Sequence, residues 1–272
     1  MKFTGCRKGM VIMNIGIFDS GIGGMTVLHQ ALKSLPKENY IFYADTDNVP
    51  YGTKTREQVV GFVDNVMKFM IEHDCKAVVI ACNTATAAAA AIMREKYDIP
   101  IIGIEPAVKP AVEKSKGKRV LVAATPLTVR EEKLKNLVAR VDDDHLVDLV
   151  ALPKLVSFAE HREFSTDIVC QYLKEEFSGY DLNKYGELVL GCTHFNYFKD
   201  SFRKIMPCSV QIIDGSQGTV NQLKRILEQR NQLEENDGEV KYFASGRGLT
   251  TDDELRQVQK LHDRLEDMCK II

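Results

Sequence analysis

Two cysteines, Cys82 and Cys192, occupy matching sequence contexts that could support acid/base chemistry. Around Cys82 the chain reads AVVIACNTAT, and around Cys192 it reads ELVLGCTHFN. In each case an apolar run is followed by a small residue, the cysteine and polar residues, which predicts a strand, a turn and the start of a helix. Because the N-terminal end of a helix favours negative charge, we expect this location to lower the pKa of a thiol.

A matched pair of thiols suits a reaction that needs an acid/base group on each side of one carbon. A racemase removes a proton from one face of a stereocentre and delivers a proton to the other, in both directions. The sequence therefore favours Cys82 and Cys192 as the two acid/base groups of a racemase. The remaining cysteines lack this context and are interpreted as structural or incidental: Cys6, Cys75, Cys170, Cys208 and Cys269.

Three other uses of these thiols stay open but fit less well. A zinc site would need more ligands at close spacing, and only Cys192 and His194 are near neighbours. A redox dithiol usually has the spacing C-x-x-C, which the chain lacks. A cysteine hydrolase would pair Cys192 with His194 and would leave Cys82 without a role.

The elements that must position these residues form an alternating pattern of short apolar runs and amphipathic segments. Such alternation predicts an α/β fold of mostly parallel sheets, in which ligands bind beyond the carboxyl ends of the strands. Helices are expected at 55–71, 84–96 and 252–270. The predicted strands are Asn14–Phe18, Tyr40–Ala44, Ala77–Ala81, Ile101–Gly103, Val120–Ala123, Leu146–Val150, Leu188–Leu190 and Val210–Ile213.

A glycine-rich turn, DSGIGG, follows the first predicted strand and begins with Asp19 and Ser20. It superficially resembles a dinucleotide-binding loop, but Thr26 occupies the third glycine position and Asp19 would lie close to a pyrophosphate. The alternative is that the glycines let backbone N–H groups approach a small carboxylate. Asp19 would then meet a substrate ammonium group or assist a thiol, whereas Ser20 also suits a simple helix cap.

The bulk composition is that of an ordinary globular protein. The chain has 272 residues, is 44% hydrophobic and 27% charged, and carries a net charge of −2, so it indicates no nucleic-acid partner. No apolar run is long enough for a membrane span. Free thiols without C-x-x-C spacing predict a cytoplasmic location. The initial MKFTGCRKGMVIM reads as a short extension and not as a signal peptide.

Taken together, the motifs FDSGIGG, PYG, ACNTA and LGCTHF closely resemble those of the glutamate racemases in the aspartate/glutamate racemase superfamily. The resemblance covers about residues 14–218. It implies two α/β domains related by pseudo-symmetry, with the active site in the cleft between them, and we expect residues 1–105 plus 214–272 to form one and residues 106–213 the other. It further implies a cytoplasmic enzyme, a homodimer, that makes D-glutamate for peptidoglycan without metal, pyridoxal phosphate or nucleotide.

The resemblance also assigns roles to particular residues. Cys82 is similar to the base that acts on D-glutamate, and Cys192 to the base that acts on L-glutamate. Asp19 and His194 resemble groups that assist Cys82 and Cys192, respectively. Glu160 lies where the family often has a carboxylate near the histidine, and it is also expected to contact substrate. The other residues that match substrate-binding groups of the family are Ser20, Pro50, Tyr51, Gly52, Asn83, Thr84, Thr128 and Thr193.

Several readings stay open beside glutamate racemisation. A sister racemase would act on aspartate, a hydantoin or another carboxylate-bearing amino acid, and aspartate racemases typically have an acidic residue where His194 stands. A binding protein that kept the fold without turnover is a reading of a different class. Thr125 and Thr128 follow a predicted strand, where a threonine can be merely a helix cap.

Overall fold

The computed structural model of the chain describes residues 13–235 and 237–271, so the predicted N-terminal extension lies almost wholly outside the described residues. The strands form two sheets, a six-stranded one with the order β10-β9-β2-β1-β3-β4 and a four-stranded one with the order β6-β5-β7-β8. Every pair of neighbouring strands is parallel except β9 and β10. The strands are β1 (Asn14–Asp19), β2 (Tyr40–Ala44), β3 (Cys75–Ile80), β4 (Ile101–Gly103), β5 (Arg119–Ala124), β6 (Val147–Ala151), β7 (Tyr185–Leu190), β8 (Gln211–Asp214), β9 (Val240–Ala244) and β10 (Arg247–Gly248).

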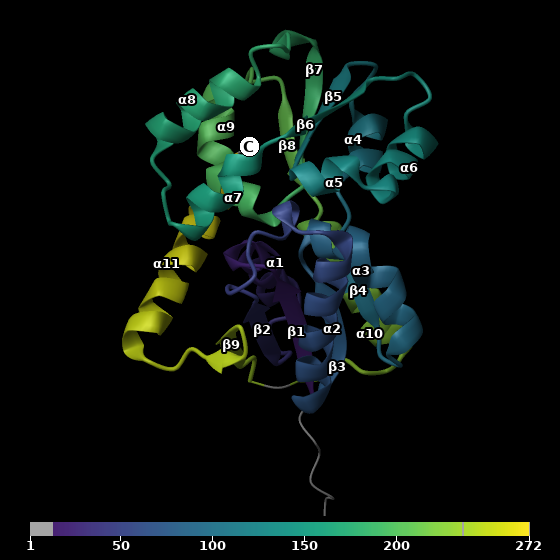
Figure 1. Cartoon of the computed structure of the whole chain (residues 1–272), viewed down its shortest axis with the longest axis vertical. Coiled ribbons are helices and arrows are strands. Elements are labelled where there is room, and N and C mark those ends of the chain that lie inside the picture. Colours follow the sequence, from purple (N-terminus) through teal and green to yellow (C-terminus); the bar gives the residue numbers. More distant parts are fainter. Residues whose placement is uncertain (1–12, 236, 272) are drawn as a thin grey trace, which may run out of the picture.

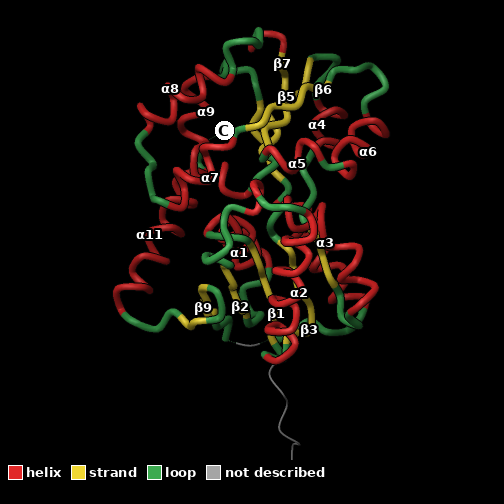
Figure 2. Tube along the Cα trace, in the orientation of Figure 1, coloured by secondary structure: helices red, strands yellow, loops and turns green. Residues whose placement is uncertain are grey.

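Helices enclose both sheets (Figures 1 and 2). Around the larger sheet, α1, α10 and α11 pack into one apolar cluster, and α2 and α3 pack into another. The α-helices are α1 (Met25–Ser34), α2 (Arg56–Glu72), α3 (Asn83–Lys96), α4 (Val108–Lys114), α5 (Pro126–Arg130), α6 (Glu132–Val141), α7 (Pro153–Glu160), α8 (Thr166–Glu176), α9 (Lys199–Ile205), α10 (Ser216–Gln229) and α11 (Asp252–Cys269). The short 3₁₀ helices are η1 (Ile22–Gly24), η2 (Tyr51–Thr53), η3 (Leu182–Lys184) and η4 (Thr193–Phe198).

The predicted α/β class is confirmed, and the eight predicted strands correspond to β1 through β8. The helix expected from residue 55 is α2, where Thr55 and Gln58 form a capping box. Sequence patterning missed β9 and β10. β9 is a five-residue strand, VKYFA, whose pairing with β2 joins segments about 200 residues apart in the chain, and local periodicity carries no information about such a pairing.

The two sheets repeat one strand order, which explains the matching cysteine contexts. β2-β1-β3-β4 in the first sheet corresponds to β6-β5-β7-β8 in the second. Under this correspondence β3 is equivalent to β7, so Cys82 and Cys192 follow equivalent strands. β1 is equivalent to β5, and the strand registers make Asp19, the last residue of β1, equivalent to Ala124, and Ser20 equivalent to Thr125. The division of the chain into two domains at residues 105 and 213 stays a prediction.

The carboxyl ends of the two sheets face each other across the middle of the molecule (Figure 1). Side chains from the ends of β1 and β7 are hydrogen-bonded there, through Asp19 and Thr193. No helix in the described part of the chain is long and apolar enough to cross a membrane. The residues predicted to do chemistry therefore meet between the two sheets.

Candidate active site

Cys82 is held at the start of α3 by its own side chain. It is the N-cap residue, and its Sγ accepts a hydrogen bond from the backbone N–H of Ala85 at 3.4 Å. On its other side, the thiol donates to Ser20 Oγ at 3.7 Å, and the Ser20 hydroxyl donates to Asp19 Oδ1 at 3.1 Å. A chain of polar hydrogens thus joins the Cys82 thiol to the Asp19 carboxylate.

The expected lowering of the thiol pKa is wrong for Cys82. Burial, followed by the charges of Asp19 and Cys192, raises the pKa of this thiol to about 12, against the lowering effects of the Ala85 and Ser20 hydrogen bonds. The physical reason is desolvation: the side chain is almost fully buried, so that a thiolate loses its hydration, and one helix N-terminus does not compensate. A pKa this high favours the thiol form of Cys82 at neutral pH.

Cys192 has a different local structure, so the two sites are equivalent in topology but not in detail. It precedes the 3₁₀ helix η4 and not an α-helix, and its side chain caps nothing. Its Sγ lies 3.8 Å from His194 Nδ1. His194 Nε2 in turn lies 2.6 Å from Glu160 Oε1, at the end of α7. The predicted grouping of Cys192, His194 and Glu160 is present as a linear array.

The array favours the protonated form of His194. Burial acts to lower the pKa of the imidazole, but hydrogen bonds and charges from Cys192 and Glu160 outweigh it, so that the pKa of His194 lies well above its ordinary value. A protonated ring donates from both nitrogens, one toward the Cys192 sulfur and one toward the Glu160 carboxylate. The Cys192 sulfur thus faces a cation, while Cys82 faces the neutral hydroxyl of Ser20.

Asp19 belongs to both halves of the site. It is fully buried at the end of β1, where Oδ1 accepts hydrogen bonds from Ser20 Oγ and the N–H of Gly21, and Oδ2 accepts one from Thr193 Oγ1 at 2.8 Å. Burial raises the pKa of this carboxyl, against lowering effects of the His194 charge and of these hydrogen bonds. Asp19 therefore ends the chain of hydrogen bonds that begins at Cys82, and it also contacts Thr193, the residue that follows Cys192.

The glycine turn is in contact with a carboxylate, but the carboxylate belongs to the protein. The N–H of Ile22 donates to Glu160 Oε1 at 2.8 Å. A Cβ at Gly21 would overlap Glu160, and a Cβ at Gly23 would lie 2.6 Å from Thr193 Oγ1 and overlap His194. The glycines thus allow protein groups to lie close to the backbone of the turn, and these groups are Glu160, Thr193 and His194. The expected approach of a substrate carboxylate stays a prediction.

Three threonines form a second polar cluster beside Cys82. The hydroxyl of Thr84 lies 3.0 Å from that of Thr125 and 3.1 Å from that of Thr128, and Thr125 donates to Thr128 at 3.0 Å. All three side chains are buried. A Cβ at Gly52 would lie 3.0 Å from Thr125 Cβ, so η2 packs directly on the segment after β5. Predicted residues Thr84, Thr128 and Gly52 are thus brought together.

Tyr51 and Pro50 contact other residues of the protein at the wall of the site. Tyr51 is buried, its ring lies against Phe18, and its hydroxyl donates to Asp45 Oδ2 at 2.6 Å. Burial, followed by the hydrogen bond to Asp45, raises the pKa of Tyr51 far above its ordinary value. The Pro50 carbonyl accepts from Thr53 Oγ1 at 3.0 Å. Their predicted contact with substrate stays a prediction.

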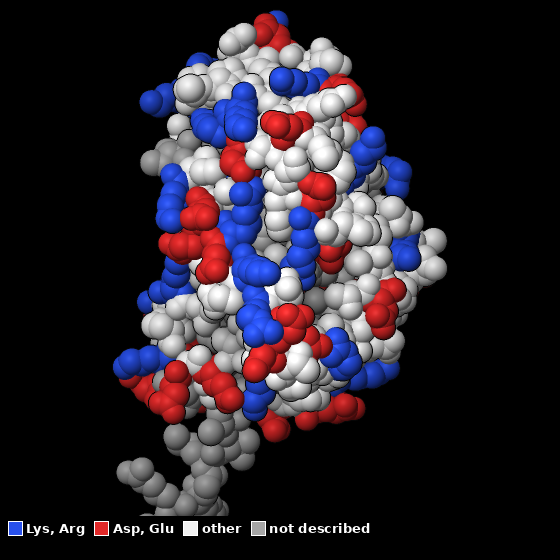
Figure 3. Space-filling view, turned by 90° about the vertical axis from the view of Figure 1, so that its left-hand side faces the viewer, with Lys and Arg blue, Asp and Glu red and all other residues white. Residues whose placement is uncertain are grey.

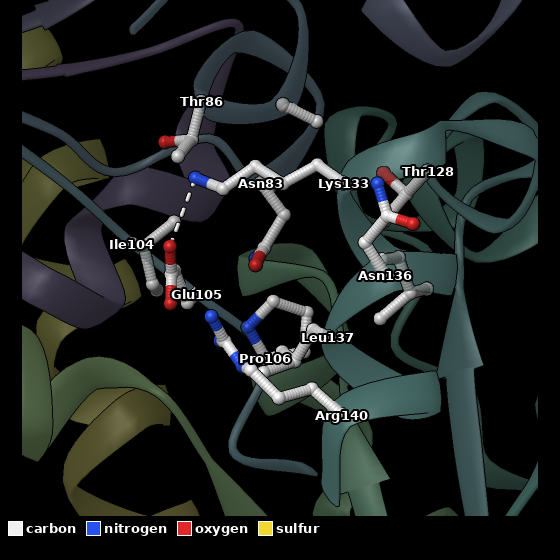
Figure 4. Close-up of a pocket in the computed structure, with 12 residues that line it drawn as sticks. Asn83, Thr86, Ile104, Glu105, Pro106, Thr128, Lys133, Asn136, Leu137 and Arg140 are labelled. Atoms are coloured by element: carbon white, nitrogen blue, oxygen red, sulfur yellow. Dashed lines mark ion pairs between the residues drawn. The ribbon is translucent and has the colours of Figure 1, made fainter. Parts of the chain in front are cut away.

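Asn83, the residue after Cys82, points to a cavity of about 240 Å³ between α3 and α6 (Figure 4). Thr128 lines the same cavity, and Lys133 and Glu105 form an ion pair of 3.0 Å across it. The Asn83 Oδ1 atom is buried and has no hydrogen-bond partner among the described residues. Asn83 and Thr128 therefore have polar side chains available on the α3 side of the site.

Three residues that shape the site are not among the predicted site residues, namely Thr26, Thr125 and Tyr197. From the sequence Thr125 suits either a helix cap or a ligand, and the strand registers place it after β5 in the position that Ser20 occupies after β1. Thr26 Oγ1 donates to the Thr193 carbonyl at 3.1 Å, and Tyr197 Oη donates to the Ile22 carbonyl at 3.1 Å. The LGCTHF motif, extended by two residues, contains Tyr197, but nothing local indicates a partner 175 residues away.

Known proteins resemble this chain in both sequence and structure. A family model described as Asp/Glu/Hydantoin racemase matches residues 13–223. A glutamate racemase of Lachnospira eligens is 54% identical over 95% of this chain and 100% of its own, and glutamate racemase 2 of Bacillus subtilis is 51% identical over 94% and 97%.

The crystal structure of glutamate racemase from Francisella tularensis in complex with D-glutamate superposes with a TM-score of 0.78. It is 30% identical to this chain, and the match covers 93% of this chain and 94% of that one. These similarities agree with the geometry of the site, in which two matched thiols and the polar groups around them lie between two similar sheets. The chain therefore belongs to the Asp/Glu/Hydantoin racemase family and stands among its glutamate racemases.

Proposed function

We propose that this protein interconverts L- and D-glutamate with Cys82 and Cys192 as the two acid/base groups. The observation that supports this most directly is that equivalent strands, β3 and β7, bring both thiols to the region between the two sheets. Their electrostatic coupling is seen in the effect of Cys192 on the pKa of Cys82. The relative of Francisella tularensis was solved with D-glutamate bound, which supports the choice of substrate.

In this mechanism each thiol acts as the base toward one enantiomer and as the acid toward the other. For L-glutamate, the Cys192 thiolate, beside the His194 imidazolium, removes the α-proton and becomes a thiol. The electron pair left on Cα is delocalised into the α-carboxylate. The Cys82 thiol then delivers its proton to the opposite face and becomes a thiolate, which completes D-glutamate with one proton taken and one given. D-glutamate follows the same steps in reverse.

Asp19 links substrate binding to the state of Cys82. The substrate's ammonium group would place a positive charge near the buried Asp19 carboxylate, and that charge offsets the repulsion which Asp19 exerts on a Cys82 thiolate. The hydroxyls of Thr84, Thr125 and Thr128 provide donors for a carboxylate. Ser20, Asn83 and Thr193 supply further donors or acceptors beside the thiols.

The chemistry proposed here uses protein side chains alone, with neither a metal ion nor pyridoxal phosphate nor a nucleotide. We propose further that the protein acts in the cytoplasm as a homodimer and supplies D-glutamate for peptidoglycan. These proposals rest on membership of the family and are independent of the geometry of the two thiols.

Circular dichroism of L-glutamate with purified protein and no added cofactor tests the activity. The optical signal should decay to zero, and in D₂O deuterium should appear at Cα of the product. L-aspartate in the same assay is the matched control for substrate choice. Deuterium incorporation into aspartate and not into glutamate would assign the protein to a sister activity, and no incorporation into either would leave a binding role.

A further inference from the structure

The C-terminal helix α11 connects the larger sheet to the segment that carries His194. It begins beside β9 and β10 and runs toward the second sheet (Figure 1), where Arg264, near its C-terminal end, pairs with Asp200 of α9. Its buried face, which includes Val258, Leu261 and Leu265, packs on α1 and on η4. On the side of the molecule seen in Figure 3, basic and acidic side chains are interspersed over the surface. Long-range charge attraction between large patches therefore does not explain how α11 is held.

One side chain of α11, Arg264, makes several specific contacts with the segment after Cys192. Its Nε and Nη2 atoms donate to the carbonyl of Tyr197 at 3.1 and 2.8 Å. Nη2 also pairs with Asp200 Oδ2 at 2.7 Å, and the guanidinium lies 5.4 Å from the centre of the Phe164 ring. The planar fork of arginine is suited to such convergent acceptors in a way that a lysine ammonium is not.

These contacts fall at the C-terminal end of η4. A 3₁₀ helix has poorer hydrogen-bond geometry than an α-helix and depends on its surroundings, and the last carbonyls of any helix need outside donors. A cation is also favoured at that end. η4 begins at Thr193, directly after Cys192. A hydrogen bond donated by Arg264 to the Tyr197 carbonyl therefore stabilises the short segment that includes His194.

A second route leads from Tyr197 back to His194 through hydrogen bonds. The Tyr197 hydroxyl donates to the Ile22 carbonyl at 3.1 Å, and the Ile22 N–H donates to Glu160 Oε1 at 2.8 Å. The same Glu160 oxygen lies 2.6 Å from His194 Nε2. Arg264 therefore acts on His194 from two directions, through the backbone of η4 and through the carboxylate that holds the imidazole.

We propose that Arg264 is a positioning residue for the Cys192 face of the reaction. It holds η4 against α11 so that His194 and Cys192 keep the geometry needed for proton transfer. This proposal rests on the proposed two-cysteine racemisation. Arg264 itself touches neither the sulfurs nor the substrate.

The matched control for Arg264 lies on the same helix. Arg256 pairs with Asp253 at 3.5 Å, but its side chain is 67% exposed, whereas that of Arg264 is 22% exposed. Exposed ion pairs of this kind contribute little. Arg256→Ala should therefore leave kcat/KM within about 2-fold of the wild type. Arg264→Ala should lower kcat/KM between about 10-fold and 100-fold, which is the size expected for a small displacement of an acid/base group.

The rate alone does not identify the affected face. L- and D-glutamate have equal free energy, so kcat/KM must fall by the same factor in both directions. The deuterium isotope effect on kcat/KM separates the faces. If the Cys192 step becomes slower, α-deuterated L-glutamate should show a larger effect than in the wild type, because its deuteron leaves through Cys192. α-Deuterated D-glutamate should show a smaller effect, because its deuteron leaves through Cys82.

Opposite changes in the two isotope effects, with Arg264→Lys intermediate in rate, support the proposal. Unchanged isotope effects for both enantiomers, or a rate within about 2-fold of the wild type, overturn it. If Arg264→Ala does not fold, Arg264→Lys and Asp200→Asn carry the same test, with far-UV circular dichroism to verify folding. A wild-type protein that does not racemise glutamate overturns the proposed function itself, which is a separate result.

Discussion

The hydroxyl of Thr193 donates to Asp19 Oδ2 at 2.8 Å, with both side chains buried between the two sheets. Asp19 ends β1 and Thr193 follows β7, so this single bond joins the two strand ends that lie beside the two thiols. Through Ser20, the same carboxylate is connected to Cys82. Asp19 is thus hydrogen-bonded to groups that lie beside each of the two thiols.

Asp19→Asn should separate activity from stability. Burial raises the pKa of Asp19, so ionising this carboxyl costs folding free energy, and that cost grows as the pH rises from the ordinary range of an aspartate to the raised pKa. The neutral amide should stabilise the fold at pH 7 by on the order of 1 kcal/mol while lowering kcat/KM at least about 10-fold. Thermal unfolding at pH 7 and pH 4 measures this. A variant less stable than the wild type at both pH values contradicts it.

Cys82→Ser and Cys192→Ser should each lower racemisation by about 100-fold or more in both directions, because each direction uses both thiols. Cys208→Ser and Cys269→Ser provide the controls, since these two cysteines are exposed and lie outside the site. Polarimetry or circular dichroism of each enantiomer measures the loss. Near-normal turnover by either of the first two variants would refute the two-base mechanism.

Glu160→Gln should shift the pH profile toward acid. The Glu160 charge is one of the groups that raise the pKa of His194, so its removal lowers that pKa, and the imidazolium is lost at a lower pH. Activity that needs the imidazolium should therefore decline earlier as the pH rises. The stabilisation from the raised pKa is present below about pH 6.5, the ordinary value of histidine, and is lost as the pH rises through the folded value.

The pH dependence of kcat/KM for L-glutamate measures this shift. Glu175→Gln is a control on α8, because Glu175 is exposed and distant from His194 in the hydrogen-bond network. An alkaline limb at the wild-type position in Glu160→Gln, with kcat/KM reduced uniformly, would show that Glu160 does not set the charge of His194.

Two glycine substitutions should have opposite consequences. Gly23→Ala places a Cβ against His194 and 2.6 Å from Thr193 Oγ1, so it should displace the Cys192 array and lower kcat/KM by about 100-fold. Gly61→Ala, on the exposed face of α2 with no atom within 4 Å of the added Cβ, should stabilise the protein by about 0.5–1 kcal/mol and leave activity unchanged. Chemical denaturation with activity assays on both variants measures the difference. Equal effects on activity would show that the glycine turn is not tightly coupled to His194.

The strands and helices followed from local patterns in the sequence because burial of an apolar run and capping of a helix are local events. The run before Cys82 became β3, and Thr55 capped α2 as its neighbours predict. The repeated pattern of an apolar run, a small residue and a cysteine likewise indicated equivalent positions, which are the ends of β3 and β7. Strand β9 was missed because its pairing with β2 depends on residues about 200 positions away.

Protonation was decided by tertiary structure alone. The sequence places Cys82 at a helix N-terminus, which by itself favours thiolate, but burial and the charge of Asp19 raise its pKa to about 12. His194 is predicted near Cys192 from the motif, yet its positive charge depends on Glu160, 34 residues away on α7. Desolvation and Coulomb energies depend on everything packed around a group, so no local pattern contains them.

The sequence by itself determined which residue types arrive at the strand ends: two thiols, a carboxylate, an imidazole and several hydroxyls. Tertiary structure decided how they differ. It placed Cys82 against the Ser20 hydroxyl and Cys192 against the His194 imidazole, and it brought Arg264 to the end of η4. The identity of a residue is encoded locally, whereas its partners, and therefore its charge and its role in the reaction, arise only when distant segments pack together.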